Sequence, residues 1–123
     1  MQQLMFESSW DKAIAEQDRV KIEQSFSRQA LLIGASIHFV YDKKAVNYKQ
    51  EILITTLIHN GTEEPLMIED ALINFVEGDQ HLQGIFTVPC TIPAKSSMPW
   101  TFIFSETNSS ESPKYHIVFE NQM

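Results

Sequence analysis

Two apolar runs that meet at Asn60-Gly61 constrain the fold of this chain more than any other feature. Together they fill the stretch from Gln50 to Val76. Asn and Gly both accept a positive φ at little cost, so the dipeptide predicts a turn between two strands. The first run, Lys49–His59, has apolar residues on both faces, which is typical of a central strand or of one covered by a helix. We therefore expect a β domain organised around this pair of strands.

Other segments of the chain also have strand character. Pro89 and Pro93 flank a candidate edge segment, because proline cannot donate to a ladder. Asp42–Lys44 and Ala94–Ser97 are expected to be polar breaks. The pattern predicts a mostly β fold, namely an immunoglobulin-like antiparallel β-sandwich of about six or seven strands; an open α+β sheet with a helix on one face is the alternative. The further strand candidates are Leu31–Tyr41, Leu66–Val76, His81–Val88, Pro99–Phe104 and Lys114–Glu120.

The N-terminal segment predicts one amphipathic α-helix over about residues 9–28. Ser8 and Ser9 offer an N-cap, and no Gly or Pro occurs from Trp10 to Arg28. A narrow stripe at i+4 spacing needs a surface to cover, and the sheet downstream is the obvious one. The stripe consists of Trp10, Ile14, Asp18, Ile22 and Phe26.

The length predicts a single domain over residues 1–123, with the β region at about 31–120. The net charge of −7 is concentrated in residues 51–94, which contain seven acidic residues and no Lys or Arg. An acidic surface argues against binding to nucleic acid or to anionic lipid. These acids either solvate turns or form a docking surface for a basic partner, and the candidate positions are Glu63, Glu64, Glu69 and Asp70.

The sequence also bears on the compartment. The single cysteine, Cys90, cannot form an internal disulfide. The N-terminus lacks the apolar core of a signal peptide, and no apolar run reaches about 18 residues. We therefore expect a cytoplasmic protein without direct membrane insertion.

No residue pattern points to catalysis. The four histidines lack the spacing of a metal site, so neither a metal nor a cofactor is expected. Cys90 lies outside any nucleophile motif, and neither a nucleophile elbow nor a Gly-rich phosphate loop occurs. We expect a protein that is not an enzyme. The histidines are His38, His59, His81 and His116.

Three stretches together resemble the SLAP domain, which is named for an S-layer assembly protein of Gram-positive bacteria. Ser9–Lys12 resembles its opening, Ile58–Gly61 its central Asn-Gly segment, and Met98–Phe104 its closing strand. The resemblance covers about residues 4–105. It leaves a tail from Glu106 to Met123, in which Thr107–Pro113 has the composition of a flexible loop.

The resemblance implies a function in an accessory Sec export system. It suggests a non-enzymatic protein-interaction module that acts as an accessory factor in protein export or S-layer assembly. Its expected partner is a component of the export machinery or a secreted precursor. The better-known member of the family carries the domain in duplicate, whereas this chain has one copy.

Trp10 and Trp100 have two interpretations. They either pack in the core or frame an exposed groove for a partner peptide, since Trp is enriched at binding hot spots. A partner would bind at an edge or a face of the sheet. The alternative function is a structural domain that self-associates as a homodimer.

Overall fold

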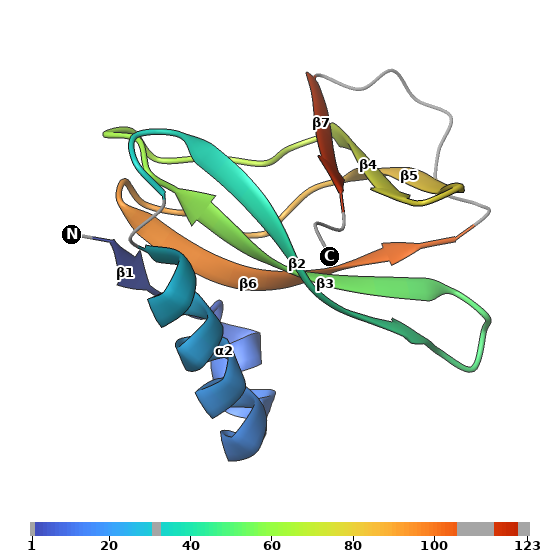
Figure 1. The fold of residues 1–123 in the computed structure, drawn as a ribbon, viewed down its shortest axis with the longest axis horizontal. Helices are drawn as coiled ribbons and strands as arrows, with labels where there is room; N and C mark the ends of the chain where they lie inside the picture. The colour runs from blue at the N-terminus through green and yellow to red at the C-terminus, as the bar shows by residue number, and fades with distance from the viewer. Residues whose placement is uncertain (1, 31–32, 106–114, 121–123) are drawn as a thin grey trace.

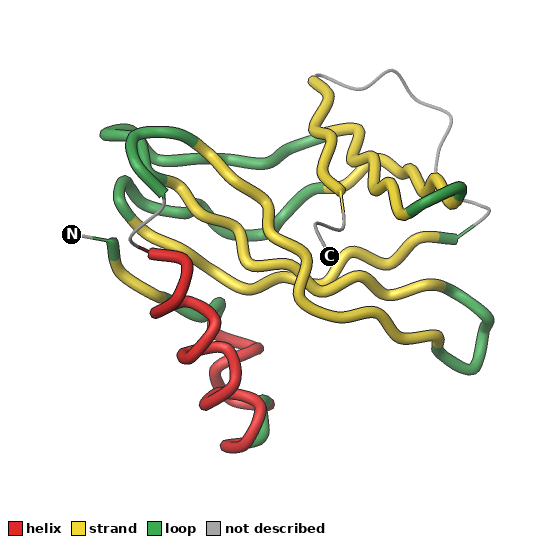
Figure 2. Tube along the Cα trace, viewed as in Figure 1, coloured by secondary structure: helices red, strands yellow, loops and turns green. Residues whose placement is uncertain are grey.

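A computed structural model describes residues 2–30, 33–105 and 115–120. The mostly β fold is confirmed, with two sheets and two N-terminal helices (Figures 1 and 2). The loop expected over Thr107–Pro113 lies outside the described residues.

The larger sheet is built around the first apolar run. Its strand order is β1-β6-β3-β2, so the predicted central position of β3 is confirmed. β3 pairs antiparallel with both neighbours, and every residue from Ile54 to Asn60 is buried. A strand that is covered on both faces has apolar residues on both, as this sequence does. The strands are β1 (Gln3–Leu4), β2 (Ile37–Val46), β3 (Ile52–Asn60) and β6 (Ser96–Phe104).

The smaller sheet has the order β5-β4-β7 and packs on one face of the larger one. The strands are β4 (Ala71–Glu77), β5 (Gln80–Phe86) and β7 (Tyr115–Glu120). Aromatic rings join the two sheets: Phe86 meets Phe102 edge-on at 5.1 Å, and Tyr41 stacks on Phe75 at 5.4 Å. The apolar core lies between the sheets.

The strand pairing is mixed rather than wholly antiparallel. β1 runs parallel to β6, and β7 runs parallel to β4. Parallel neighbours need a long connection, and both helices and β2–β5 separate β1 from β6 in the sequence. The immunoglobulin-like arrangement stays a prediction.

The predicted single helix is in fact two. α1 (Ser8–Ala13) and α2 (Glu16–Gln29) are separated by Ile14 and Ala15, whose backbone is extended. The side chain of Glu7, not a serine, caps α1 by accepting from the backbone N–H groups of Ser9 and Trp10.

Arg19 fixes the angle between the two helices. Its guanidinium donates to the Asp11 carbonyl oxygen at 2.9 Å, pairs with the Asp11 carboxylate at 2.9 Å, and lies 4.7 Å from the centre of the Phe6 ring. Tertiary contacts therefore stabilise a break that no Gly or Pro encodes.

Several strand boundaries differ from the prediction; β4, for example, begins at Ala71 rather than at Leu66. β2 begins at Ile37 and runs through Asp42–Lys44, where a bulge replaces the expected break. A bulge lets the strand continue through a polar segment while one residue stays unpaired. β6 begins at Ser96 instead of Pro99, because Ser96 and Ser97 pair with both β1 and β3.

The chain does turn back after Asn60-Gly61, as predicted, but the expected cause, a positive φ at these residues, is wrong. Neither residue has a positive φ. Asn60 is fully buried, and its amide nitrogen lies within hydrogen-bonding distance of the carbonyl oxygens of Glu64, Ile92 and Pro93. At Gly61 a Cβ would lie 2.3 Å from a backbone oxygen, so only glycine fits. The pair anchors a crossing from one sheet to the other.

Candidate functional site

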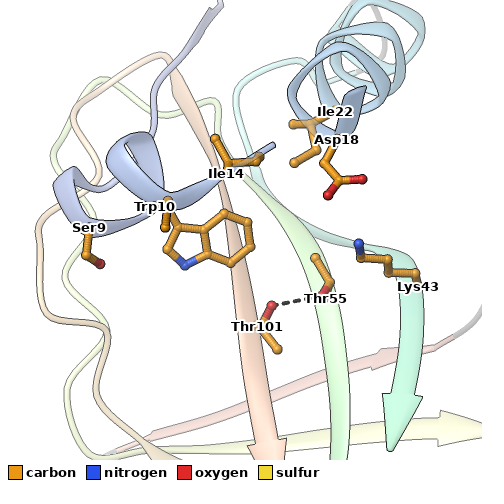
Figure 3. Close-up of a pocket in the computed structure, with 9 residues that line it drawn as sticks. Ser9, Trp10, Ile14, Asp18, Ile22, Lys43, Thr55 and Thr101 are labelled. Carbon is orange, nitrogen blue, oxygen red and sulfur yellow. Dashed lines mark hydrogen bonds between the residues drawn. The ribbon is translucent and has the colours of Figure 1, made fainter. Parts of the chain in front are cut away.

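A groove of about 430 Å³ lies between the helices and the outer face of the larger sheet (Figure 3). It opens where α1 ends and α2 begins. Its size is in the range of ordinary ligand pockets. Its lining residues are Ser9, Trp10, Ala13, Ile14, Asp18, Ile22, Lys43, Thr55 and Thr101.

The floor of the groove is one row of side chains that crosses three strands. Lys43 of β2 is in register with Thr55 of β3, and Thr55 is in register with Thr101 of β6. The two threonine hydroxyls bond to each other at 2.8 Å. The groove therefore runs across the strands, from the β2 edge toward α1.

Trp10 forms one end of this groove. Its ring stacks on Trp100, with centroids 6.2 Å apart, and both side chains are half-buried. Trp100 also packs against the core, whereas Trp10 lines the groove. Trp100 is therefore a core residue and Trp10 a wall residue of the groove, and the binding of a partner peptide there stays a prediction.

The opposite end is ionic. Asp18 and Lys43 point into the same opening (Figure 3), yet neither makes an ion pair within the described part of the chain. The neighbouring Lys44, by contrast, pairs with Glu77 at 3.3 Å. Two opposite charges at one mouth are therefore available to an occupant.

Beyond the groove, the same sheet face is closed by a buried polar network. His59 is fully buried and stacks on Phe26 of α2 at 6.4 Å. Its Nε2 donates to the amide oxygen of Gln29 at 2.7 Å, and its Nδ1 accepts from the Ser97 hydroxyl at 2.6 Å. The amide of Gln2 donates to that hydroxyl at 3.1 Å. The network joins α2, both central strands and the N-terminal segment.

Burial sets the charge state of this histidine. Loss of hydration lowers the pKa of His59 to about 4, and the neighbouring His38 on β2 adds to the effect. The ring is therefore neutral at physiological pH, and it is a structural link rather than a base open to substrate.

The predicted acidic positions lie away from the groove. Glu63 pairs with Lys95 at 3.5 Å, and Glu64 is exposed in the same loop. Glu69 and Asp70 precede β4, where Asp70 has a φ of 51°. None of the four lines the groove, and their role as a docking surface stays a prediction.

The remaining candidates for chemistry are dispersed. His81 bonds to Asn74 at 2.9 Å on the smaller sheet, and His38 bonds to Ser36 at 2.7 Å. Burial raises the pKa of the Cys90 thiol, which contacts Met98. Among the described residues, no group of three or more His, Cys, Asp or Glu is placed to hold a metal ion. The side chain of His116 lies outside the described residues.

The groove residues that sequence reasoning missed include Asp18 as a charged site, Lys43, Thr55 and Thr101. The role of Asp18 could have been predicted from the sequence, because Asp18 is the one charged residue in an otherwise apolar i+4 stripe. The other three come together only through strand register, which no local pattern gives.

The comparisons with known proteins agree with the resemblance. Within the described residues, neither helix is long and apolar enough to cross a membrane. No curated protein and no solved structure matches the chain. The family model described as "SLAP domain" matches residues 4–120, which extends well into the tail that the resemblance left out. This chain belongs to the SLAP domain family.

Proposed function

We propose that this protein is a non-enzymatic interaction module that binds a segment of a protein partner in the groove between its helices and its larger sheet. The observation that carries the proposal is the arrangement of the groove. It has a half-buried tryptophan at one end, hydroxyls on its floor, and at the other end two charges that make no ion pair among the described residues. Grooves of this composition suit a peptide with an apolar anchor and a few polar contacts.

The proposed binding site is on a face of the sheet rather than at an edge. The floor row crosses the strands, so a bound segment lies across them and does not extend the ladder. This differs from strand addition, in which main-chain hydrogen bonds at a free edge supply the affinity.

The proposed context is protein export or S-layer assembly in a Gram-positive bacterium, which is what the resemblance to the SLAP domain implies. We propose a cytoplasmic accessory factor whose partner is a component of the export machinery or a secreted precursor. The acidic overall charge favours the approach of a basic partner segment.

A groove-filling variant tests the proposal. Ala13 lines the groove from the last position of α1 and is exposed, so Ala13→Trp fills the space without removing core atoms. Gln17→Trp is the matched control, because Gln17 is an exposed helical residue that does not line the groove. Calorimetric titration with purified export components and precursors should show binding at least about tenfold weaker for Ala13→Trp and unchanged for Gln17→Trp. Equal binding by both variants would exclude the groove.

Self-association is the second candidate function, and exposed apolar residues favour it. Val46, the last residue of β2, is 56% exposed, and Tyr48 in the turn that follows is 88% exposed. The helical stripe does not supply this surface, since Ile22 and Phe26 face the sheet. Sedimentation equilibrium distinguishes the two functions: a monomer at tens of micromolar removes the homodimer, whereas a dimer that Tyr48→Ser dissociates supports it.

A further inference from the structure

We infer that the groove selects a peptide in which a bulky apolar side chain is followed, about three residues later, by an adjacent acidic and basic pair. This inference rests on the proposed function and specifies its partner class. Three features carry it: the aromatic end, the two charges that make no ion pair within the described residues, and the strand spacing along the floor of the groove.

The aromatic end fixes the anchor. The Trp10 ring is held by its stack on Trp100, and Ile14 stands beside it in the wall of the groove. A preformed apolar wall receives a large aliphatic or aromatic side chain with little loss of its own freedom. A small or polar side chain would leave this wall in contact with water.

The ionic end fixes the charged pair. Asp18 and Lys43 each lack an ion pair within the described residues, whereas Asp11 and Glu77 already have cationic partners. An occupant that displaces water from the groove also lowers the local dielectric, which raises the cost of leaving either charge uncompensated. A basic side chain toward Asp18 and an acidic one toward Lys43 compensate both.

The strand spacing sets the separation between the apolar residue and the charged pair of the peptide. Neighbouring strands lie about 4.8 Å apart, so the row from Thr101 through Thr55 to Lys43 spans roughly 10 Å. An extended peptide rises about 3.3 Å per residue, and three residues therefore cover this row. The two threonine hydroxyls lie between the ends, where they can exchange their mutual bond for bonds to the peptide backbone.

A displayed random peptide library, selected on the full chain, tests this inference. The library is first depleted on Ala13→Trp protein, so that only peptides specific for the groove remain. The expected sequences have a large apolar residue followed about three positions later by the charged pair. Their affinity should fall about tenfold with Asp18→Asn or Lys43→Gln and stay within about twofold with Glu23→Gln or Lys21→Gln. Glu23 and Lys21 are exposed on α2 and outside the groove, which makes them matched charge controls.

Charge exchange sharpens the test. The double variant Asp18→Lys with Lys43→Asp should lose the selected peptides and recover binding when the two peptide charges are exchanged. Groove-specific peptides without any charge preference overturn this inference and leave the proposed function standing. Failure to select any groove-specific peptide overturns both. A dimer that Ala13→Trp dissociates identifies a second copy as the occupant and also overturns the inference.

Discussion

The two ends of helix α2 rest on the same face of the same sheet, but they meet it in different ways. Toward its C-terminus, Phe26 and Gln29 contact the buried His59, and no buried side-chain nitrogen or oxygen of the described residues lacks a hydrogen-bond partner there. Toward its N-terminus, Asp18 stands over a groove of about 430 Å³ with no ion pair among the described residues. One helix thus has a closed end that packs on the sheet and an open end that stands over a groove.

The difference follows from the side chains of the sheet rather than from those of the helix. At the closed end, Ser97 of β6 and His59 of β3 fill the space with a hydrogen-bonded pair. At the open end, the corresponding pair on the same strands is Thr101 and Thr55, which bond to each other and leave the space above them unfilled. Small hydroxyl side chains on the floor therefore leave room for the groove below the junction of the two helices.

Removing the histidine at the closed end should have the largest effect on stability. His59→Ala removes the partner of the Gln29 amide oxygen, leaves the buried Ser97 hydroxyl with the Gln2 amide alone, and removes the stack on Phe26. We expect the free energy of unfolding to fall by about 3 kcal/mol, measured by urea denaturation. His38→Ala, at an exposed position on β2, is the control and should change it by less than about 0.5 kcal/mol. A loss below about 1 kcal/mol for His59→Ala would mean that the closed end does not hold the helix.

Acid should weaken the closed end by a similar amount. The pKa of His59 is about 4 in the folded protein and near 6.5 in the unfolded chain. Between these values the unfolded chain binds a proton that the folded protein does not. The contribution of neutral His59 to the free energy of unfolding is therefore fully present above pH 6.5. On acidification below pH 6.5 this contribution falls by about 1.4 kcal/mol per pH unit, so that about 3 kcal/mol is lost by pH 4.

The check on this prediction is the difference between the wild type and His59→Gln across pH 4 to 7.5, because groups common to both proteins cancel. His38 is the titratable neighbour, so the series is repeated in a His38→Gln background. A difference that does not vary with pH would assign the acid sensitivity to other groups.

Trp10→Ala should have an intermediate effect on stability and a large one on binding. The ring is only half-buried, so its loss removes the stack on Trp100 without opening the core. We expect unfolding to be easier by about 1 to 2 kcal/mol, less than for a fully buried tryptophan. Partner binding measured on the folded variant should be lost. A stability loss of about 4 kcal/mol would mean that Trp10 is a core residue like Trp100.

Much of the fold could be predicted from the sequence, because its signals are local. The two-faced apolar pattern of β3 predicted a central strand, and the i+4 stripe predicted which side of the helical segment meets the sheet. The break at Ile14 and Ala15 could not be predicted. No residue there disfavours a helix, and contacts made by Arg19 stabilise the bend.

Less of the site could be predicted, because strand pairing rather than any local pattern brings most of its residues together. Trp10 was identified from its residue type. Thr55 and Thr101 are separated by most of the β region, and only the pairing of β3 with β6 places them side by side. The buried position of His59 beside Ser97 also depends on the pairing of β3 with β6.

The smallest expected effects come from deleting one hydroxyl at each end of the interface. Ser97→Ala and Thr101→Val change two residues that lie on the same face of the same strand. At the closed end the lost hydroxyl leaves His59 Nδ1 without a donor and out of reach of water, which should cost about 1 to 2 kcal/mol. At the open end water in the groove replaces the lost partner of Thr55, so the cost should stay below about 0.5 kcal/mol.

Urea denaturation of both variants at pH 7.5 measures this difference directly, with Thr91→Val as a control at an exposed position outside the groove. Equal losses at Ser97 and Thr101 would mean that water does not enter the groove, and the open end would then be part of the packed interior. A loss confined to Ser97 means that the groove is hydrated in the free protein. Its water is then available for displacement by a partner, which is the property that a binding groove requires.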